Sequence, residues 1–212
     1  MDIIENTKKF IRSFFENEFS GHDHFHSFRV YELACKIAAK EHADISIVSL
    51  AALLHDVDDI KLSPQTYENK ENAHRFLKEQ GLCESDISRI IKIIDEVSFQ
   101  GTDSVKPSTL EGQCVQDADR LDALGAIGIA RAFAFGGNHN RVMYDPEIPP
   151  VIGMNKEEYR NHVSTTVNHF YEKLFLLKDM INTKSAYAIA CQREAYMKDF
   201  IDEFMKEWDG KD

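Results

Sequence analysis

The sequence has few of the residues that interrupt helices, because its 212 residues include only 5 prolines and 10 glycines. A fold of many short strands needs frequent turn residues, so this scarcity argues against a β sandwich or barrel. Hydrophobic residues make up 43% of the chain and charged residues 29%, a balance that also argues against a disordered chain. We therefore expect one all-α domain over residues 1–212.

Cysteine and long apolar runs are also scarce. The four cysteines form no C-x-x-C pair, so we expect reduced thiols in a cytoplasmic protein and no disulfide framework. No run reaches about 18 consecutive apolar residues. The first residues, MDIIENTKKF, carry acids where a secretory signal has a basic region followed by an apolar one. We expect neither a membrane span nor export.

An excess of positive charge is absent. The chain has 25 Lys and Arg residues against 36 Asp and Glu residues, which gives a net charge of -11. No stretch rich in Lys and Arg interrupts this acidity, so long nucleic acid is not an expected partner. A small phosphorylated ligand remains compatible, because a divalent cation and a few arginines can reverse the potential within one pocket.

Apolar residues recur with helical spacing along most of the chain. The clearest pattern runs from Asp23, as N-cap, to about residue 41. Asp44 is placed to cap a helix through SIVSLAALLHDV, which is apolar on nearly all sides and should be buried. Further helices are expected near residues 3–19, 65–80, 84–98, 114–135, 155–177 and 183–208.

The expected organisation is a metal-site core over about residues 21–135, with the C-terminal helices of about residues 155–208 packed on it. Gly136 and Gly137 should end the helix that includes residues 114–135. Residues 138–153 contain three prolines and are expected to form an irregular excursion, with a lid as one role for it. The aromatic C-terminal segments are core or subunit-interface material, so a homodimer is compatible with them.

His55 and Asp56 stand at the end of the most apolar helix, followed by Asp58 and Asp59. Three carboxylates at the negative end of a helix dipole are unfavourable, by a few tenths to about 1 kcal/mol for each exposed carboxylate. A bound cation would remove this conflict and use His55 and Asp56 as ligands. Taken alone, the dipeptide is equally typical of a solvated acidic turn.

His26 and Asp119 are the other candidate ligands. His26 shares the inward face of its helix, although a lone inward histidine is more typical of a hydrogen-bonded core residue. Asp119 lies in QDADRLDALG within a largely apolar segment, and a buried acid needs a partner. The alternative is that Asp117, Asp119 and Asp122 are helix-start acids that pair with Arg120.

Three segments in the order H, HD, D carry a family resemblance: GHDHFHSFRV, AALLHDVDDIK and VQDADRLDALGAIGIARAF. They resemble the HD superfamily of metal-dependent phosphohydrolases, specifically its bacterial stand-alone branch, and the likeness extends over nearly the whole chain. The resemblance implies an HD-domain helical bundle and hydrolysis of a phosphoester or phosphoanhydride bond. It maps the metal ligands onto His26, His55, Asp56 and Asp119, with His22 as the alternative to His26.

Two imidazoles and two carboxylates leave room for water and suit an octahedral Mn2+, Mg2+, Fe2+, Co2+ or Ni2+ ion better than a structural zinc. Such an ion is expected to lower the pKa of a water molecule and orient it for in-line attack on phosphorus. The candidates for proton transfer are, in order, Asp59, Glu96 and Asp122. Each is equally typical of an exposed acid or a salt-bridge partner.

Phosphate oxygens need cations, and guanidinium groups bind phosphate through two parallel hydrogen bonds. Lys61 and Arg131 are the preferred candidates for substrate binding. Ion pairing with nearby acids is the alternative for every candidate. The remaining candidates are Arg29, Arg120 and Arg141.

The expected function is phosphate or pyrophosphate release from a small phosphorylated substrate, with a nucleotide preferred. The nucleotide rests on the resemblance to HD-domain nucleotidases and nucleoside triphosphate pyrophosphohydrolases. Two alternatives stay open, a phosphodiesterase acting on a cyclic nucleotide and a non-catalytic metal or nucleotide sensor. The first is less favoured because IIDEVSF lacks the second-metal histidine pair of many binuclear members.

Overall fold

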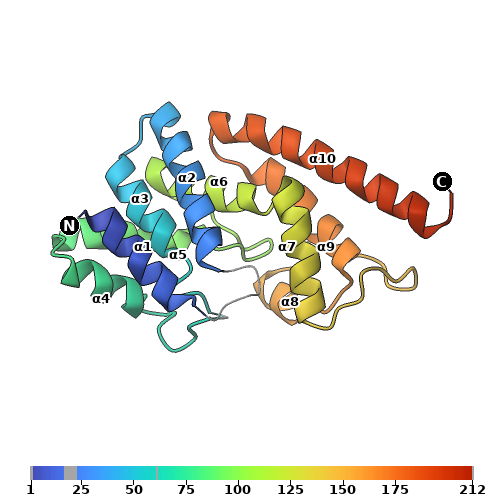
Figure 1. Ribbon diagram of the computed structural model, residues 1–212, viewed down its shortest axis with the longest axis horizontal. Coiled ribbons are helices and arrows are strands. Elements are labelled where there is room, and N and C mark those ends of the chain that lie inside the picture. Colours follow the sequence, from blue (N-terminus) through green and yellow to red (C-terminus); the bar gives the residue numbers. More distant parts are fainter. Residues whose placement is uncertain (1, 17–22, 61, 212) are drawn as a thin grey trace. The chain divides into compact units, whose positions relative to one another are not determined.

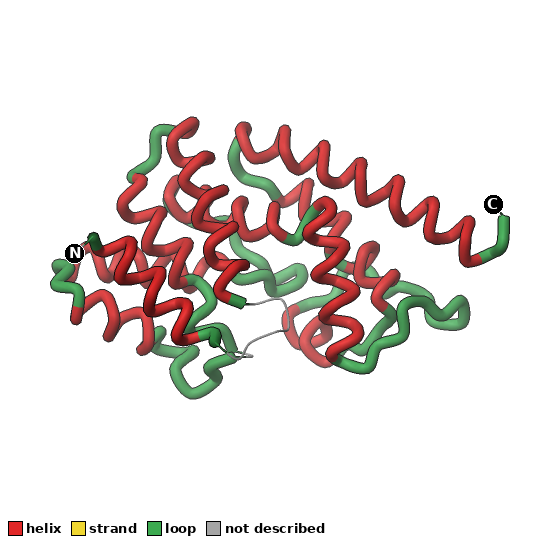
Figure 2. The backbone as a smooth tube through the Cα atoms, viewed as in Figure 1, coloured by secondary structure: helices red, strands yellow, loops and turns green. Residues whose placement is uncertain are grey.

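Helices make up nearly all the regular structure of the chain, as the all-α expectation requires (Figures 1 and 2). The computed structural model describes residues 2–16, 23–60 and 62–211. Within these ranges the only β interaction is an isolated bridge between Gln100 and Thr102. No helix in the described ranges is long and apolar enough to cross a membrane.

The chain divides into two compact units. The first comprises Met1–Phe99 with Val105–Asp119, and the second comprises Gln100–Ser104 with Arg120–Asp212. Five helices lie wholly in the first unit, and a sixth, α6 (Leu110–Asp122), begins there and ends in the second. The five are α1 (Ile3–Phe14), α2 (His24–Glu41), α3 (Ile45–Leu54), α4 (Glu71–Glu79) and α5 (Glu84–Val97).

The core of the first unit is built around α3. Every residue of α3 from Ile47 to Leu54 is buried, and the helix packs against α1, α2 and α5. The Asp44 carboxylate accepts hydrogen bonds from the backbone N–H groups of Ser46 and Ile47, at 3.1 and 3.4 Å. These contacts confirm the predicted cap and the predicted burial of this helix, because an element apolar on all sides needs neighbours on all sides.

Two helices in the N-terminal part of the chain are shorter in the structure than predicted. The helix predicted near residues 3–19 ends at Phe14, and residues 17–22, including the alternative ligand His22, lie outside the described ranges. The helix predicted near residues 65–80 begins only at Glu71, after a series of turns. Lys70 explains this start, because its left-handed backbone (φ 47°) cannot belong to a right-handed helix.

The single helix predicted over residues 114–135 is wrong, because the chain breaks between α6 and α7 (Gly125–Asn138). Gly125, the first residue of α7, has a φ of +74°, so the right-handed helical backbone of α6 cannot continue through it into α7. Gly136, predicted to end the helix, lies inside α7 instead. A Cβ added there would clash with the Thr166 Oγ1 atom, so this glycine allows close packing between α7 and α9.

The helix predicted near residues 155–177 is also wrong, because three short elements replace it. Asn155 and Thr165 each cap a separate helix. In the segment between these two helices, His162 and Ser164 donate hydrogen bonds to the buried carboxylate of Glu172. The last predicted helix is present and capped by Thr183. These elements are α8 (Lys156–Asn161), α9 (Thr166–Glu172), the 3-10 helix η1 (Leu174–Met180) and α10 (Lys184–Trp208).

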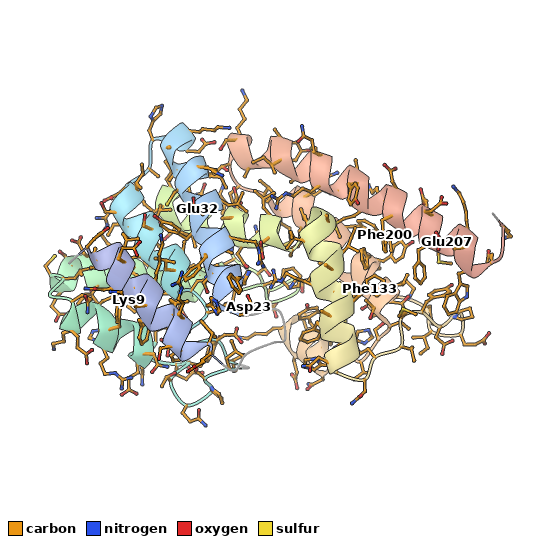
Figure 3. The ribbon with its side chains drawn as sticks, viewed as in Figure 1. Lys9, Asp23, Glu32, Phe133, Phe200 and Glu207 are labelled. Carbon is orange, nitrogen blue, oxygen red and sulfur yellow. The ribbon has the colours of Figure 1, made fainter. Side chains whose placement is uncertain are left out.

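An aromatic cluster forms the core of the second unit. Phe133 on α7 and Phe200 on α10, both labelled in Figure 3, approach edge to face with ring centroids 5.9 Å apart. Phe170, which is fully buried on α9, and Phe204 complete the cluster at 6.1 Å from Phe133. Phe170, Phe200 and Phe204 belong to the C-terminal segments predicted as core or interface material, and with Phe133 they join three helices.

The irregular excursion predicted at residues 138–153 is held to α9. The backbone N–H groups of Thr166 and Val167 donate to carbonyl oxygens of Val142 and Met143 at 3.1 and 2.9 Å. Asn168 adds a side-chain hydrogen bond to the carbonyl of residue 148 at 2.7 Å. The excursion thus satisfies N–H groups at the start of α9, and its role as a lid stays a prediction.

Thiol reactivity offers a test of the packing in the first unit. Burial raises the pKa of the Cys114 thiol to about 12, and the negative charge of Asp117 adds to the effect, whereas Cys83 is exposed. Because the thiolate is the reactive form, iodoacetamide at about pH 8 should label Cys83 and spare Cys114 until urea unfolds the protein. Peptide mass spectrometry measures both sites, and equal labelling of the native protein would contradict the buried position of Cys114.

Candidate metal centre

Four side chains from three segments of the first unit converge on one point. The Nε2 atoms of His26 and His55 lie 3.2 Å apart. Asp56 places one carboxylate oxygen 3.3 Å from each of these nitrogens. The Oδ1 atom of Asp119 lies 3.4 Å from His26 Nε2 and 3.8 Å from His55 Nε2. The structure thus brings together the four ligands that the sequence predicted.

The orientation of His55 follows from the end of α3. Its Nδ1 atom lies 2.8 Å from the backbone carbonyl of Ala52, one turn earlier, and both groups are buried. A carbonyl can only accept, so Nδ1 carries a proton and Nε2 is the ring nitrogen that faces the other three side chains. A backbone carbonyl that fixes the tautomer in this way is typical of metal-binding histidines.

His26 is held by the capped start of α2. The Asp23 carboxylate, labelled in Figure 3, accepts a hydrogen bond from the backbone N–H of His26 at 2.8 Å. This bond fixes the first turn of α2, and the His26 ring is fully buried. The predicted N-cap and the predicted inward direction of His26 are both confirmed.

Asp119 is the most accessible member of the group, with 27% of its side chain exposed. Burial alone would raise the pKa of this carboxyl group, but the hydrogen bond with His26 and the charges of both imidazoles outweigh it. The pKa of Asp119 is therefore lowered to about 2, and the group is a carboxylate at neutral pH. It can offer a negatively charged oxygen to a cation.

The side chain of Gln116 fixes the position of α6 close to Asp119. It is fully buried, and its Nε2 lies 3.0 and 2.9 Å from the backbone carbonyls of Glu96 and Val105. One amide thus joins α6 to the end of α5 and to the loop that follows. Gln116 was not predicted as a site residue, although its position one turn before Asp119 was visible in the sequence.

The donor set fits a divalent cation. His26, His55 and Asp56 are buried and offer ligand atoms that all lie within 4.8 Å of one another. Adjacent ligands of an octahedral ion with bonds of about 2.1 Å are separated by about 3.0 Å, which is close to the measured distances. Two imidazole nitrogens only 3.2 Å apart also need a proton or a cation between them.

The three carboxylates after α3, which the sequence alone did not distinguish, have different environments. Asp56 faces the histidines, whereas Asp58 is buried and accepts hydrogen bonds from the start of α4. Asp59, the first candidate for proton transfer, is half-buried, and its backbone N–H donates to the carbonyl of Asp56 at 3.1 Å. The charge of Asp58 is therefore offset by N–H groups of α4 and does not need the cation expected beside Asp56.

The other two proton-transfer candidates have structural partners. Glu96 accepts hydrogen bonds from the backbone N–H and the hydroxyl of Ser108, at 2.9 and 3.1 Å. Asp122 is buried in the second unit and forms an ion pair with Arg131 at 2.8 Å. Asp122 thus matches the salt-bridge alternative, and the roles of both acids in proton transfer stay predictions.

The predicted phosphate-binding cations differ in accessibility. Arg120 is buried and donates to the carbonyl of Met180. Arg131 pairs with Asp122, and Arg141 is half-buried with its guanidinium 5.3 Å from the centre of the Phe135 ring. Lys61 lies outside the described ranges. Phosphate binding stays a prediction for all these cations.

Comparisons with known proteins agree with this class of fold and site. Residues 24–124 match the HD domain family. The chain is 37% identical to the uncharacterised protein YpgQ of Bacillus subtilis over 210 residues, which cover 98% of this chain and 95% of YpgQ.

Two solved structures extend the comparison. An HD-superfamily hydrolase from Bacillus thuringiensis is 41% identical, with a TM-score of 0.75 over 97% of this chain and 96% of that one. The crystal structure of B. subtilis YpgQ in complex with ADP is 36% identical, with a TM-score of 0.78 over 99% of this chain and 100% of that one.

The helical fold and its His-His-Asp group define a metal-dependent phosphohydrolase. This chain belongs to the HD-domain family. The predicted family is therefore confirmed.

Proposed function

We propose that this protein hydrolyses a phosphoester or phosphoanhydride bond of a nucleotide and releases phosphate or pyrophosphate. The convergence of two imidazoles and two carboxylates on one point carries the proposal. YpgQ, 36% identical over 99% of this chain, was crystallised with ADP, which supports a nucleotide over other phosphorylated molecules.

The proposed ligands are His26, His55, Asp56 and Asp119. All four offer nitrogen or oxygen atoms and none is a thiolate, which favours Mn2+, Mg2+, Fe2+, Co2+ or Ni2+. When bound, the ion supplies Lewis-acid stabilisation of phosphoryl charge and makes water a better nucleophile. Asp119 is partly exposed, so solvent contacts the ligand group at this carboxylate. The other three side chains are buried.

Asp59 is the proposed proton-transfer group. It lies three residues after Asp56 and is half-buried. Glu96 accepts hydrogen bonds from Ser108 and Asp122 forms an ion pair with Arg131, so both also have structural roles. Asp59 is preferred because it lies one turn beyond His55, in the segment that carries two of the proposed ligands.

Arg141 and Lys61 are the proposed phosphate-binding cations. Arg120 is buried and donates to a backbone carbonyl, and Arg131 is paired with a buried acid. Arg141 is half-buried beside the Phe135 ring, an arrangement that leaves a guanidinium able to donate several hydrogen bonds. Local cations of this kind are needed because the chain as a whole carries a net charge of -11.

Hydrolysis of a nucleotide panel tests the proposal. Metal-stripped protein resupplied with Mn2+, Mg2+, Co2+ or Zn2+ should release phosphate or pyrophosphate only with metal. Asp119→Ala should lower turnover at least about 100-fold, because the substitution removes one of four ligand groups. Quantifying both products shows which bond is cut.

The same assay separates the alternative functions. Turnover confined to cyclic nucleotides would identify a phosphodiesterase. A protein that binds both metal and nucleotide without turnover would be a sensor. Turnover that persists in metal-stripped protein with a chelator would contradict the proposed metal centre.

A further inference from the structure

The Asp58 carboxylate is buried two residues after Asp56, with 1% of the residue exposed. Its two oxygens accept hydrogen bonds from the backbone N–H groups of Asn72 and Ala73, at 3.2 and 2.9 Å. These donors belong to the first turn of α4, which is 14 to 15 residues away in sequence. Asp58 therefore joins the turn that carries His55 and Asp56 to a separate helix.

The start of α4 has no side-chain cap of its own. Its N-cap residue, Lys70, makes no capping hydrogen bond and has a left-handed backbone with a φ of 47°. The first N–H groups of a helix have no partner within the helix, and the helix dipole favours a negative charge beside them. Asp58 supplies both the acceptor and the charge.

The side chain of Asn72 adds a further hydrogen bond from α4 to the same turn. The Asn72 side-chain amide donates to the backbone carbonyl of Val57 at 3.2 Å and to the Thr66 hydroxyl at 3.0 Å. Residues 57 and 58 are thus held to α4 through both a carbonyl and a carboxylate. We refer to these hydrogen bonds of Val57, Asp58, Asn72 and Ala73 as the α4 clasp.

The clasp matters because His55 and Asp56 lie beyond the last residue of α3. Helical hydrogen bonding ends at Leu54, and single turns follow, such as the bond from Val57 N–H to the Leu54 carbonyl at 3.2 Å. The two candidate ligands therefore stand between the end of a helix on one side and the clasp on the other.

We propose that Asp58 is a positioning residue for the metal centre: through the α4 clasp it holds the turn that directs His55 and Asp56 toward His26. Asp58 differs from the proposed ligands because both of its oxygens face N–H groups of α4, and it is not among His26, His55 and Asp56, whose ligand atoms lie within 4.8 Å of one another. The inference rests on the proposed metal centre, and it assigns to the second acid of HDVDD a role distinct from that of the first.

Mn2+ binding, measured by isothermal titration calorimetry on metal-stripped protein, tests the inference. Asp58→Ala should weaken Mn2+ binding by about 10- to 100-fold, the effect typical of residues that orient metal ligands. The matched control is Thr165→Ala, which removes a buried helix cap in the second unit. It should lower the Tm comparably while Mn2+ affinity stays within about two-fold of the unmodified protein.

Two milder variants keep the test decisive if Asp58→Ala does not fold. Asp58→Asn retains one acceptor oxygen for the N–H groups of α4 and should restore most of the affinity. Asn72→Ala removes only the side-chain half of the clasp and should weaken binding by a smaller factor than Asp58→Ala.

Unchanged Mn2+ affinity in these variants, with a lowered Tm, would overturn the inference and make Asp58 a purely structural cap. That result would leave the proposed function intact, because the unmodified protein would still bind Mn2+ and turn over nucleotide. Failure of the unmodified protein to bind Mn2+ would instead overturn the metal centre and the positioning role together.

Discussion

Replacing Asp56 with alanine should abolish divalent metal binding and lower hydrolysis by roughly 1,000-fold or more, while helical content is retained. Asp56 approaches the two imidazoles through separate carboxylate oxygens, each 3.3 Å from an Nε2 atom, whereas Asp119 approaches both through Oδ1. Its loss removes a charged donor from the centre of the group, and Lewis-acid stabilisation is worth several kcal/mol. Calorimetry with Mn2+ and a nucleotide turnover assay measure the two effects.

A matched control for Asp56→Ala is Asp179→Ala, which removes an aspartate whose side chain is 74% exposed in η1. Its exposed ion pair with Lys178 contributes at most about 1 kcal/mol, so both metal binding and turnover should persist. Circular dichroism of Asp56→Ala is the decisive measurement for the role of the site. A collapse of the helical signal would mean that the four side chains have a structural role and would contradict the proposed chemistry.

Replacing Arg131 with methionine should lower the free energy of unfolding by about 3 kcal/mol. The guanidinium forms an ion pair with Asp122 at 2.8 Å, and the Asp122 side chain is only 2% exposed. Removing the cation leaves a buried carboxylate without this ion pair, and the desolvation of that charge is no longer offset. Urea unfolding monitored by circular dichroism measures the change.

The double variant Asp122→Leu with Arg131→Met provides the control. Replacing both partners with apolar side chains removes the buried charge as well as its cation, so most of the lost stability should return. The outcome also addresses the predicted phosphate-binding role of Arg131. A single variant that keeps its stability but loses affinity for nucleotide would assign Arg131 to the substrate and contradict a structural ion pair.

The sequence predicted the helices whose limits depend on local chemistry. Asp23, Asp44 and Thr183 accept hydrogen bonds from the first N–H groups of α2, α3 and α10, and an acceptor at this position acts within a few residues. The burial of α3 was also predictable from the sequence, because a helix that is apolar on all sides is stable only where neighbours cover all its faces.

The helix breaks were not predictable in the same way. Gly125 and Gly136 stand in one apolar stretch, yet the chain breaks at the first and stays helical through the second. What distinguishes them is the backbone angle at Gly125 and the approach of Thr166 to Gly136, and both depend on packing between distant segments.

The candidate site was likewise predictable only in part. The residue types and their order predicted His26, His55, Asp56 and Asp119, because two imidazoles and two carboxylates suit a divalent cation. The same reasoning could not separate Asp56 from Asp58, since both follow one helix and carry the same charge.

The sequence by itself therefore determined the helices that begin at local caps, the burial of α3 and the side chains that can bind a metal. Only the tertiary structure decided the partner of each acid. Asp56 faces the histidines, and Asp58 faces the start of α4. Glu96 faces Ser108, and Asp122 faces Arg131. The reason is physical. A carboxylate has the same chemistry wherever it lies in the sequence, and its function is set by the donors that folding places within about 3 Å of its oxygens.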